Sequence, residues 1–562
     1  MTAQEPMTAP PSSDKFETAK MEWAQRRARY AGRLRPAKIL SGLPVKTVYT
    51  QDDLADSDLD EMPGVYPFTR GLYPDGYALT PWMQQMVFGY GTIEETRQKM
   101  EKMVAEGMEG YLGHKVFNTV YDIPCMYGID ADHPEAAGNL GQCGVHMSTG
   151  DDYDELIRGW DLSSTNFSMI TGENCLPALA LLAAAVERRG EPVSSMHGNS
   201  MNWYPRIAVQ DVPSWEPQWG YALMIDLIRW AKDNAPDWNP ANIFMYGLSE
   251  AGATPVQELA YGLAWGKSII DAGLAAGLAP DEFIGRLSFQ IGCTVSVFEE
   301  AAKFRAHRRM WAKICRDAGA TKPSNMHARV HVHTSGYVLT QQQLMNNNAR
   351  ITLQALAAVL GGVQSIHTCS YDEAVGVPTE ESHRTALRTQ QILMWESGLR
   401  DVADPLGGSY YVEKLTDDME AAAWEIYNEI EEAGGYLSGI ETGEIKRSID
   451  NSSYEMKKLI NSGELPVVGV NRYVSDQEEN YEPFRVDSSI EEKAKARLAR
   501  YRARRDAGAV RPALDDVRAA CQALKNGTGS LMPALVDAAR NGATNGEMME
   551  AMRGAFGWYV SE

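Results

Sequence analysis

The sequence predicts an α/β protein, a TIM (β/α)8 barrel with an N-terminal extension and a helical C-terminal region. Between about residues 160 and 410, short β-like runs alternate with amphipathic segments of helical length, which indicates repeated βα units on a parallel sheet. The starts of successive β-like runs lie roughly 35 to 43 residues apart, enough for one strand, one helix and two loops. An eight-stranded barrel is the economical way to close such a series.

The N-terminal extension comes first, over residues 1–45. Its first 20 residues are polar and rich in proline and contain no apolar core of a signal peptide, so we expect a partly disordered segment and a cytoplasmic protein. The longest apolar run of the chain, residues 176–186, is too short to span a bilayer and predicts a buried helix.

The barrel is expected over residues 46–415. Within it, the clearest β-like runs and helical patterns predict strands at residues 243–246, 286–291, 328–333 and 362–366, and helices at residues 298–316 and 342–360.

The composition changes after Gly407-Gly408 to helical segments rich in Glu, Lys, Arg and Ala. We therefore expect residues 416–562 to form a helical region that docks on the barrel and on a partner subunit. Within it, residues 491–506 read as a solvated charged stretch, and residues 531–559 as an apolar-periodic helical pair.

Composition excludes several classes of protein. The formal net charge is −22, from 75 acidic and 53 basic residues, which argues against a nucleic-acid surface. No run of apolar residues predicts a membrane protein. The seven cysteines form no C-x-x-C pair, as is typical of free thiols in a reducing compartment, so neither a zinc site nor a disulfide framework is expected.

Polar residues gather where the predicted strands end, and in such barrels the carboxyl ends of the strands carry the chemistry. These residues are Tyr246 with Glu250, Gln290, His331 with His333, and Gln364 with His367 and Glu373. We therefore expect these side chains to surround one shared opening, the mouth of the barrel at the carboxyl ends of its strands.

The pair His331 and His333 leaves a second class of function open. The two residues alternate with valines, so both imidazoles face the same side of a strand, and such a pair could bind a metal ion for hydrolysis. A metal-dependent barrel hydrolase would want more ligands, however, and His367 is the only obvious late histidine. We therefore assign no metal ligands.

The segment Tyr66-Pro67-Phe68-Thr69-Arg70-Gly71, followed by Tyr73-Pro74 and Tyr77, resembles the entry motif of the adenosylcobalamin-dependent acyl-CoA mutases. Further blocks match the substrate-binding part of that family in order and spacing, from about residue 40 onward. They are Glu250-Ala251-Gly252-Ala253, Arg286-Leu287-Ser288-Phe289, Ala302-Lys303-Phe304-Arg305-Ala306, His333-Thr334-Ser335-Gly336, Gln364-Ser365-Ile366-His367-Thr368, Asp372-Glu373-Ala374, Asp404-Pro405-Leu406-Gly407-Gly408-Ser409 and Val468-Gly469-Val470-Asn471-Arg472-Tyr473. The family is that of methylmalonyl-CoA mutase and its isobutyryl-CoA and 2-hydroxyisobutyryl-CoA relatives.

The resemblance implies that the CoA chain threads the barrel along its axis and that the thioester meets the cobalamin at the carboxyl-terminal mouth. It implies catalytic roles for Tyr77, Tyr246 and His333, and cofactor contacts for Glu250, Glu373 and Gly336. The acyl-CoA contacts that it implies are Tyr66, Thr69, Arg70, Tyr73, Gly247, Arg286, Ser288, His331 and Gln364. His333 departs from the family, which carries a glutamine there.

The resemblance also implies partners. The motif D-x-H-x-x-G, whose histidine coordinates cobalt in these mutases, does not occur in the sequence. We therefore expect adenosylcobalamin whose cobalt is ligated by a separate small cobalamin-binding subunit, and so a hetero-oligomer. A G-protein chaperone for cofactor loading is a further partner implied by the family.

The substrate is predicted from two further departures. Ala208 stands where methylmalonyl-CoA mutase holds a carboxylate-binding arginine, and Gly247 stands where the family carries a histidine. Since a carboxylate buried without a partner is costly, we expect a branched acyl-CoA without a free carboxylate, similar to isobutyryl-CoA.

Four alternatives to this assignment stay open. Arg206 could bind a dicarboxyl acyl-CoA similar to methylmalonyl-CoA, or the room at Gly247 and a longer loop over residues 110–134 could admit a bulkier acyl group. In an ordinary site, His197 or His333 would fill the gap left at Gly247. The chain could also bind CoA esters without catalysis.

Overall fold

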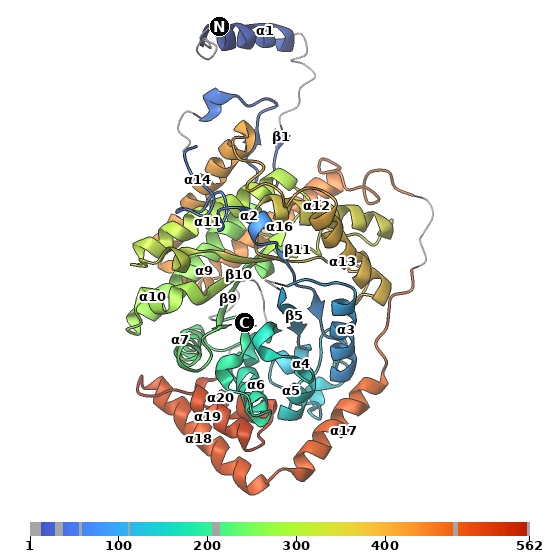
Figure 1. Ribbon diagram of the computed structural model, residues 1–562, viewed down its shortest axis with the longest axis vertical. Helices are drawn as coiled ribbons and strands as arrows, with labels where there is room; N and C mark the ends of the chain where they lie inside the picture. Colours follow the sequence, from blue (N-terminus) through green and yellow to red (C-terminus); the bar gives the residue numbers. More distant parts are fainter. Residues whose placement is uncertain are drawn as a thin grey trace, which may run out of the picture.

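Parallel strands lie in the middle of the molecule, and helices surround them in the computed structural model (Figure 1). The structure describes residues 13–28, 37–54, 59–110, 113–204, 209, 214–475 and 481–558.

The described strands form a short antiparallel pair and two five-stranded parallel sheets, with the orders β4-β5-β6-β7-β8 and β3-β12-β11-β10-β9. The strands are β1 (Ala37–Lys38), β2 (Pro44–Val45), β3 (Met83–Gln84), β4 (Val87–Phe88), β5 (Lys115–Val120), β6 (Thr165–Ile170), β7 (His197–Met201), β8 (Trp238–Asn239), β9 (Ala241–Phe244), β10 (Leu287–Cys293), β11 (Arg329–Thr334) and β12 (Ser365–His367).

Two interrupted strands join the parallel sheets into a closed barrel. Only Pro240 separates β8 from β9, and a proline has no N–H with which to continue a ladder. β8 pairs with β7 whereas β9 pairs with β10, and in the same way β3 pairs with β12 whereas β4 pairs with β5. With each interrupted strand counted once, the pairings of the described strands run round a ring of eight, which confirms the predicted (β/α)8 barrel.

The helices of the described residues follow the strands and then continue into the C-terminal region. They are α1 (Ser13–Ala28), α2 (Gly76–Leu79), α3 (Ile93–Ala105), α4 (Ile123–Met126), α5 (Gly150–Leu156), α6 (Cys175–Arg188), α7 (Pro217–Asn234), α8 (Tyr246–Glu250), α9 (Pro255–Ala275), α10 (Pro280–Phe283), α11 (Val297–Asp317), α12 (Asn347–Leu360), α13 (Glu380–Trp395), α14 (Tyr410–Glu432), α15 (Gly435–Glu441), α16 (Glu444–Ser462), α17 (Ser489–Arg504), α18 (Ala507–Lys525), α19 (Met532–Arg540) and α20 (Asn545–Phe556).

The predicted strands and helices of the barrel are present, with shifted ends. β9, β10 and β11 lie within a few residues of the predicted ranges, α6 covers the predicted buried helix, and α11 exceeds its predicted range by one residue at each end. The helix predicted from residue 342 begins only at Asn347, because Gln343 adopts a left-handed conformation with φ 51°. β12 starts three residues later than predicted because Gly361 and Gly362 still belong to the turn that ends α12.

Within the N-terminal extension, residues 13–28 form helix α1, and Figure 1 shows this helix standing apart from the body of the molecule. One prediction for the N-terminal half is wrong. Residues 110–134 are not simply a long loop, since they contain β5 and α4. β5 was missed because its outward side chains mix Lys115, Phe117 and Thr119, which blurs the alternation of apolar and polar residues.

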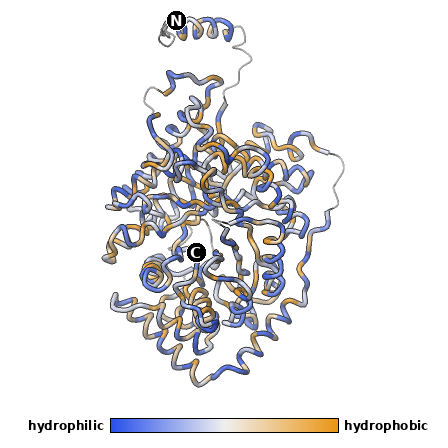
Figure 2. Tube along the Cα trace, viewed as in Figure 1, coloured by the Kyte–Doolittle hydropathy of each residue, from blue (hydrophilic) through white to orange (hydrophobic). Residues whose placement is uncertain are grey.

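The C-terminal region is helical as predicted and packs on the barrel helices. α14 lies against α9 and α11, and α19 lies against α6. The charged helix α17 is not simply solvated, because Arg497 pairs with Asp152 at 2.6 Å and Arg502 pairs with Asp130 at 2.8 Å. Figure 2 shows that hydrophobic residues gather in the middle of the molecule, while α1 is mainly hydrophilic.

Candidate active site along the barrel axis

The carboxyl-terminal mouth of the barrel brings Tyr246 and His333 together. Tyr246 begins α8 directly after β9, and its ring stacks on the His333 imidazole with centroids 4.3 Å apart and planes at 20°. On the neighbouring strand, His367 pairs in register with His333, and the two rings meet edge to face at 4.3 Å. The mouth is therefore lined by a phenol and two imidazoles in mutual contact.

Burial keeps the three imidazoles of β11 and β12 uncharged. It lowers the pKa of His331 and of His333 to about 3, and it lowers the pKa of His367 well below its usual value. His331 Nδ1 lies 2.8 Å from Ser365 Oγ, while His333 Nδ1 accepts a hydrogen bond from Gln290 Nε2 at 3.3 Å. These rings can therefore donate or accept hydrogen bonds at neutral pH, but they do not carry charge.

Glu250 and Glu373 lie beside Gly336 at the same mouth. A Cβ atom at Gly336 would stand 3.4 Å from Glu250 Oε2, 3.8 Å from Glu373 Cγ and 3.9 Å from the Tyr246 hydroxyl, so only glycine leaves this space open. Burial raises the pKa of each carboxyl to about 7. Glu250 Oε2 accepts a hydrogen bond from the Tyr337 amide at 3.1 Å, whereas its buried Oε1 has no partner.

The geometry at Gly336 fits the ribose of an adenosyl group. A sugar diol offers two O–H donors, and a carboxylate with a buried oxygen that lacks a partner is a suitable acceptor. The structure thus brings Glu250, Glu373, Gly336 and Tyr246 into one place, as the resemblance implies for the cofactor side of the site.

The barrel axis between its two ends is polar. Phe289 packs on Trp311 of α11 at 4.7 Å, so the alternating residues Ser288 and Gln290 face the axis. In most such barrels bulky branched side chains fill this position. Here the axial residues include polar groups with buried atoms that have no hydrogen-bond partner among the described residues: Asn118, Ser168, Asn199, Asn242, Gln290 and His331.

Two arginines stand at the amino end of the axis. Arg286 donates to the Pro236 carbonyl at 2.9 Å, and Arg329 donates to Asn239 Oδ1 at 3.0 Å, but neither forms an ion pair with a described carboxylate. Burial lowers the pKa of both guanidinium groups; for Arg286, the charge of Asp237 opposes this shift and the charge of Arg329 adds to it. Two cations without a carboxylate partner favour an anionic ligand here.

Arg329 is a functional candidate that the sequence reading missed. It occupies the first position of the alternating run Arg329-Val330-His331-Val332-His333, so it faces the same side as both histidines. In register it pairs with Ser288, which accepts a hydrogen bond from Asn242 at 3.0 Å. The alternation of side chains along this strand, with a period of two residues, was the signal from which Arg329 could have been predicted.

The Tyr66–Tyr77 part of the entry motif lies at this amino end and not at the mouth. The Tyr77 hydroxyl donates to the Val363 carbonyl at 2.7 Å, and Val363 precedes β12. Tyr73, Tyr77 and Gln364 line one small cavity. The structure therefore does not bring Tyr77 together with Tyr246 and His333, and Gln364 Oε1 is engaged by the Val330 amide at 2.9 Å.

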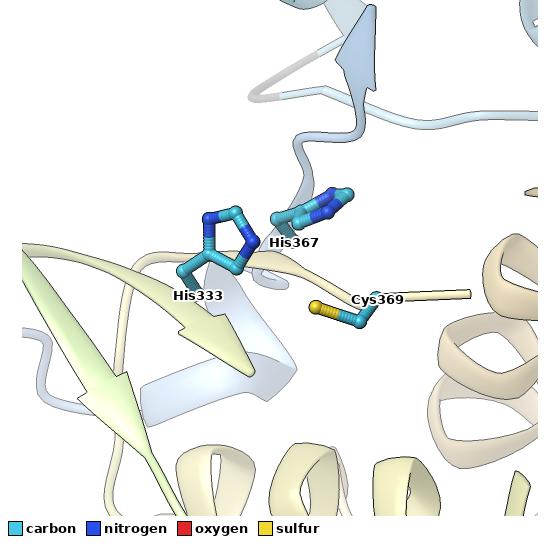
Figure 3. Close-up of side chains that lie close together, drawn as sticks. All are labelled: His333, His367 and Cys369. Carbon is cyan, nitrogen blue, oxygen red and sulfur yellow. The ribbon is translucent and has the colours of Figure 1, made fainter. Parts of the chain in front are cut away.

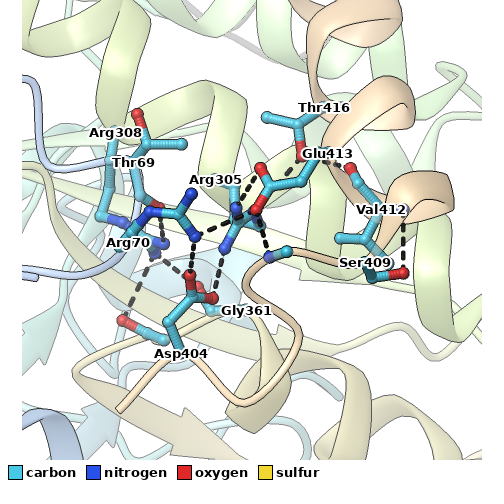
Figure 4. A network of polar contacts seen from close by, with 12 residues as sticks. Thr69, Arg70, Arg305, Arg308, Gly361, Asp404, Ser409, Val412, Glu413 and Thr416 are labelled. Carbon is cyan, nitrogen blue, oxygen red and sulfur yellow. Dashed lines mark hydrogen bonds and ion pairs between the residues drawn. The ribbon is translucent and has the colours of Figure 1, made fainter. Parts of the chain in front are cut away.

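Arg70 belongs to a buried network of ion pairs (Figure 4). It contacts Asp404 and Glu413, each at 3.0 Å, and Arg305 binds the same two carboxylates from the other side. With its charge already neutralised, Arg70 is poorly placed to bind a phosphate.

Thr69 and Tyr66 of the entry motif also contact helix α11. The Thr69 carbonyl accepts from Arg308 at 2.7 Å, and the guanidinium of Arg316 lies 4.4 Å from the centre of the Tyr66 ring. Through these contacts, Tyr66, Thr69 and Arg70 stabilise the structure of the amino end of the barrel.

The described residues contain a group that could hold a metal, formed by His333, His367 and Cys369, whose ligand atoms lie within 4.8 Å of one another (Figure 3). Two contacts oppose this role. The Cys369 thiol donates to the Thr334 carbonyl at 3.0 Å, and His367 Nδ1 accepts from the Val87 amide at 3.1 Å, so the neutral ring carries its proton on Nε2. Since His331 is not part of the group, the ligand set of the hydrolase hypothesis is not assembled.

The structure describes only part of the region around Gly247, where the acyl group is expected to bind. Gly247 is buried in α8, and the wall next to Tyr246 is aromatic, with Phe244 at 5.8 Å and Trp203 stacked over Phe244 at 6.1 Å. His197 begins β7 and so lies at the amino end, which leaves His333 as the candidate to replace the imidazole absent at Gly247. Arg206 and Ala208 lie outside the described residues.

Comparison with known proteins gives one consistent result. The family model described as methylmalonyl-CoA mutase matches residues 38–558. The 2-hydroxyisobutanoyl-CoA mutase large subunit of Aquincola tertiaricarbonis is 38% identical over 525 residues, which cover 92% of each chain. The methylmalonyl-CoA mutase of Cereibacter sphaeroides is 37% identical over 93% of this chain and 73% of its own length. The methylmalonyl-CoA mutase large subunit of Propionibacterium freudenreichii subsp. shermanii is 36% identical over 92% and 71%.

None of the described helices combines the length and the apolar character needed to cross a bilayer.

Proposed function

Because the chain belongs to the methylmalonyl-CoA mutase family, whose members are adenosylcobalamin-dependent acyl-CoA mutases, we propose that it is the large, substrate-binding subunit of such an enzyme. Its substrate in this proposal is a branched acyl-CoA without a free carboxylate, of the isobutyryl-CoA type. The observation that carries the proposal is the polar barrel axis, which joins an arginine pair at one end to an uncharged imidazole mouth at the other.

The amino half of the axis binds and orients the CoA part. Arg286 and Arg329 suit phosphate oxygens, because guanidinium groups bind them in a bidentate manner. The axial polar atoms of Asn118, Ser168 and Asn242 would pair with the amides of the extended chain. Tyr73 and Tyr77 shape the entrance, so Tyr77 takes a role in CoA binding in this proposal and not one beside the cofactor.

The carboxyl half holds the acyl group and the adenosyl group in a site that excludes water. Bound adenosylcobalamin supplies the radical chemistry of the carbon-skeleton rearrangement. Glu250 and Glu373 would hold its ribose at Gly336, while Tyr246 and His333 form a rigid wall against the acyl group. The chain itself contributes binding, orientation and exclusion of water.

The cobalt ligand belongs to a separate small subunit in this proposal. A relative that is named a large subunit, and that this chain matches over 92% of both lengths, supports it. A hetero-oligomer in the cytoplasm, with a G-protein chaperone that loads the cofactor, completes the proposal.

The test combines the purified chain with a cobalamin-binding small subunit and adenosylcobalamin and screens acyl-CoA esters for isomers by mass spectrometry. We expect conversion of isobutyryl-CoA or 2-hydroxyisobutyryl-CoA and none of methylmalonyl-CoA. Conversion of methylmalonyl-CoA would overturn the substrate assignment in favour of a dicarboxyl ester. Absence of CoA-ester binding by the chain alone would overturn the proposed function itself.

A further inference from the structure

Two imidazoles at the barrel mouth are held in the same tautomer by different parts of the chain. His367 Nδ1 accepts a hydrogen bond from the backbone amide of Val87 at 3.1 Å, and His333 Nδ1 accepts one from Gln290 Nε2 at 3.3 Å. Because a neutral imidazole has one N–H, both rings then carry their proton on Nε2.

The two rings lie close together, and no described residue occupies their Nε2–H groups. The rings meet edge to face with centroids 4.3 Å apart, on residues that pair in register on β11 and β12. Neither Nε2 forms a hydrogen bond within the described residues. Nε2 of His331 is a fully buried atom without a partner, whereas Nε2 of His333 and Nε2 of His367 are not buried in this way. His333 is further fixed by stacking on Tyr246.

We propose that His333 and His367 form a two-donor site that binds the carbonyl oxygen of the acyl-CoA thioester through their Nε2–H groups. This inference rests on the proposed function and adds to it a carbonyl-recognition pair. His367 is then a second substrate-binding residue, and Gln290 and the Val87 amide act through the rings as positioning groups.

The position of the pair supports an oxygen acceptor of this kind. Both rings face the axis at its carboxyl end, where a chain entering past Arg286 and Arg329 would bring its terminal group. Gly247, next to Tyr246, cannot supply a side-chain donor, so the stacked His333 offers the nearest N–H. Burial keeps both rings uncharged at physiological pH, which suits donation to a neutral carbonyl without protonation.

The experiment compares two ligands on the full-length chain: isobutyryl-CoA and S-isobutyl-CoA, the thioether that lacks the carbonyl oxygen. Calorimetric titration gives the ratio of their dissociation constants, and free CoA reports on the amino end. With about a tenfold gain for each of the two donors, we expect the wild-type chain to prefer the thioester by about a hundredfold. We expect each of His333→Phe and His367→Phe to lower this preference, and the double variant to abolish it while free CoA still binds.

Two further variants separate recognition from loss of structure. His307→Phe removes a buried imidazole that packs on the outer face of β10, and its ligand preference should remain that of wild type. Gln290→Glu places a carboxylate at His333 Nδ1, which moves the proton to that nitrogen, so the preference should fall about tenfold although both rings remain.

Infrared spectra of isobutyryl-CoA labelled with carbon-13 at the carbonyl give an independent readout. The bound carbonyl should absorb at lower frequency in the wild-type chain and shift back in both Phe variants. If wild type binds thioester and thioether equally, or if the double variant keeps the preference, the donor pair is wrong although the chain binds CoA esters. If neither ligand nor free CoA binds, the proposed function fails with it.

Discussion

The two ends of the barrel treat charge in opposite ways. At the amino end, Arg70 and Arg305 keep their charges and are buried between Asp404 and Glu413 (Figure 4), while Arg286 and Arg329 keep theirs without a carboxylate partner. At the carboxyl end, no described arginine or lysine pairs with the clustered side chains, and burial shifts the pKa of His333 to about 3 and that of Glu250 to about 7.

This difference in charge between the two ends of the barrel matches two chemically different parts of one ligand. A nucleotide tail brings several negative charges and is matched by cations, whereas a thioester and a carbon radical are neutral and are matched by groups that burial keeps close to neutral. Variants at both ends of the barrel can break or sharpen this separation.

The largest effect is expected at the ion network of the amino end. Arg305→Met leaves Asp404 and Glu413 without their fully buried partner, and breaking such a pair typically costs about 3–5 kcal/mol. Urea denaturation followed by circular dichroism should show this loss. Lys313→Met removes a more exposed partner of Glu420 and should cost less than about 1 kcal/mol. Equal losses in the two variants would show that the buried network has no special structural role.

The second effect concerns the unpaired arginines. Replacing Arg286 and Arg329 together with Gln should weaken binding of free CoA by about a hundredfold, or roughly tenfold for each lost charge-assisted contact. The affinity of the wild-type chain should also fall with added salt, and the double variant should lose most of this dependence. A matched variant, Arg188→Gln, removes an exposed arginine that pairs with Asp154 and should leave CoA affinity unchanged.

The third effect is a pH dependence at the carboxyl end. Burial raises the pKa of Glu250 from its usual 4.5 to about 7, so the folded state holds this proton more tightly than the unfolded state. The contribution to stability is then present below about pH 4.5 and is lost as the pH rises to about 7.

Glu250→Gln mimics the protonated carboxyl. It should therefore match wild type at pH 5 and be more stable at pH 8, by up to roughly 3 kcal/mol. Urea denaturation at both pH values measures this, with exposed Glu455→Gln as the control that shows no gain at either pH. A loss of stability at pH 8 would mean that Glu250 makes native contacts that outweigh its desolvation.

The smallest effect is expected for Tyr77→Phe. It removes the hydrogen bond to the Val363 carbonyl at 2.7 Å and should cost about 1 kcal/mol of stability. CoA affinity should change little, because the ring that shapes the entrance is retained. In the assembled enzyme, turnover should persist. Abolished turnover with normal CoA binding would instead place Tyr77 beside the cofactor, as the sequence motif alone suggested.

The local pattern of the sequence was sufficient for the part of the site that lies on consecutive strand ends. The period of two in β11 places His331 and His333 on one face, and the order of strand ends gathers Tyr246, Glu250 and Glu373 at one mouth. Strands β3, β4 and β8 were harder to find, because each is a two-residue piece of an interrupted strand.

The parts of the site that the sequence pattern did not predict depend on contacts between residues far apart in the chain. Tyr77 is assigned to the amino end by a bond to Val363, 286 residues away, and Arg70 is neutralised by Asp404, 334 residues away. The tautomer of His367 depends on Val87, 280 residues away. No periodicity or spacing encodes such pairings, because they exist only once the ring of strands has closed.

The central claim is that one CoA ester runs along the barrel axis from the arginine pair to the imidazole mouth. A crystal structure of the chain with isobutyryl-CoA tests it most directly. We predict density along the axis past Ser288 and Gln290, with phosphates near Arg286 and Arg329 and the thioester oxygen within hydrogen-bond distance of His333 and His367. Density for the CoA on the outer surface, with side chains closing the axis, would contradict the account.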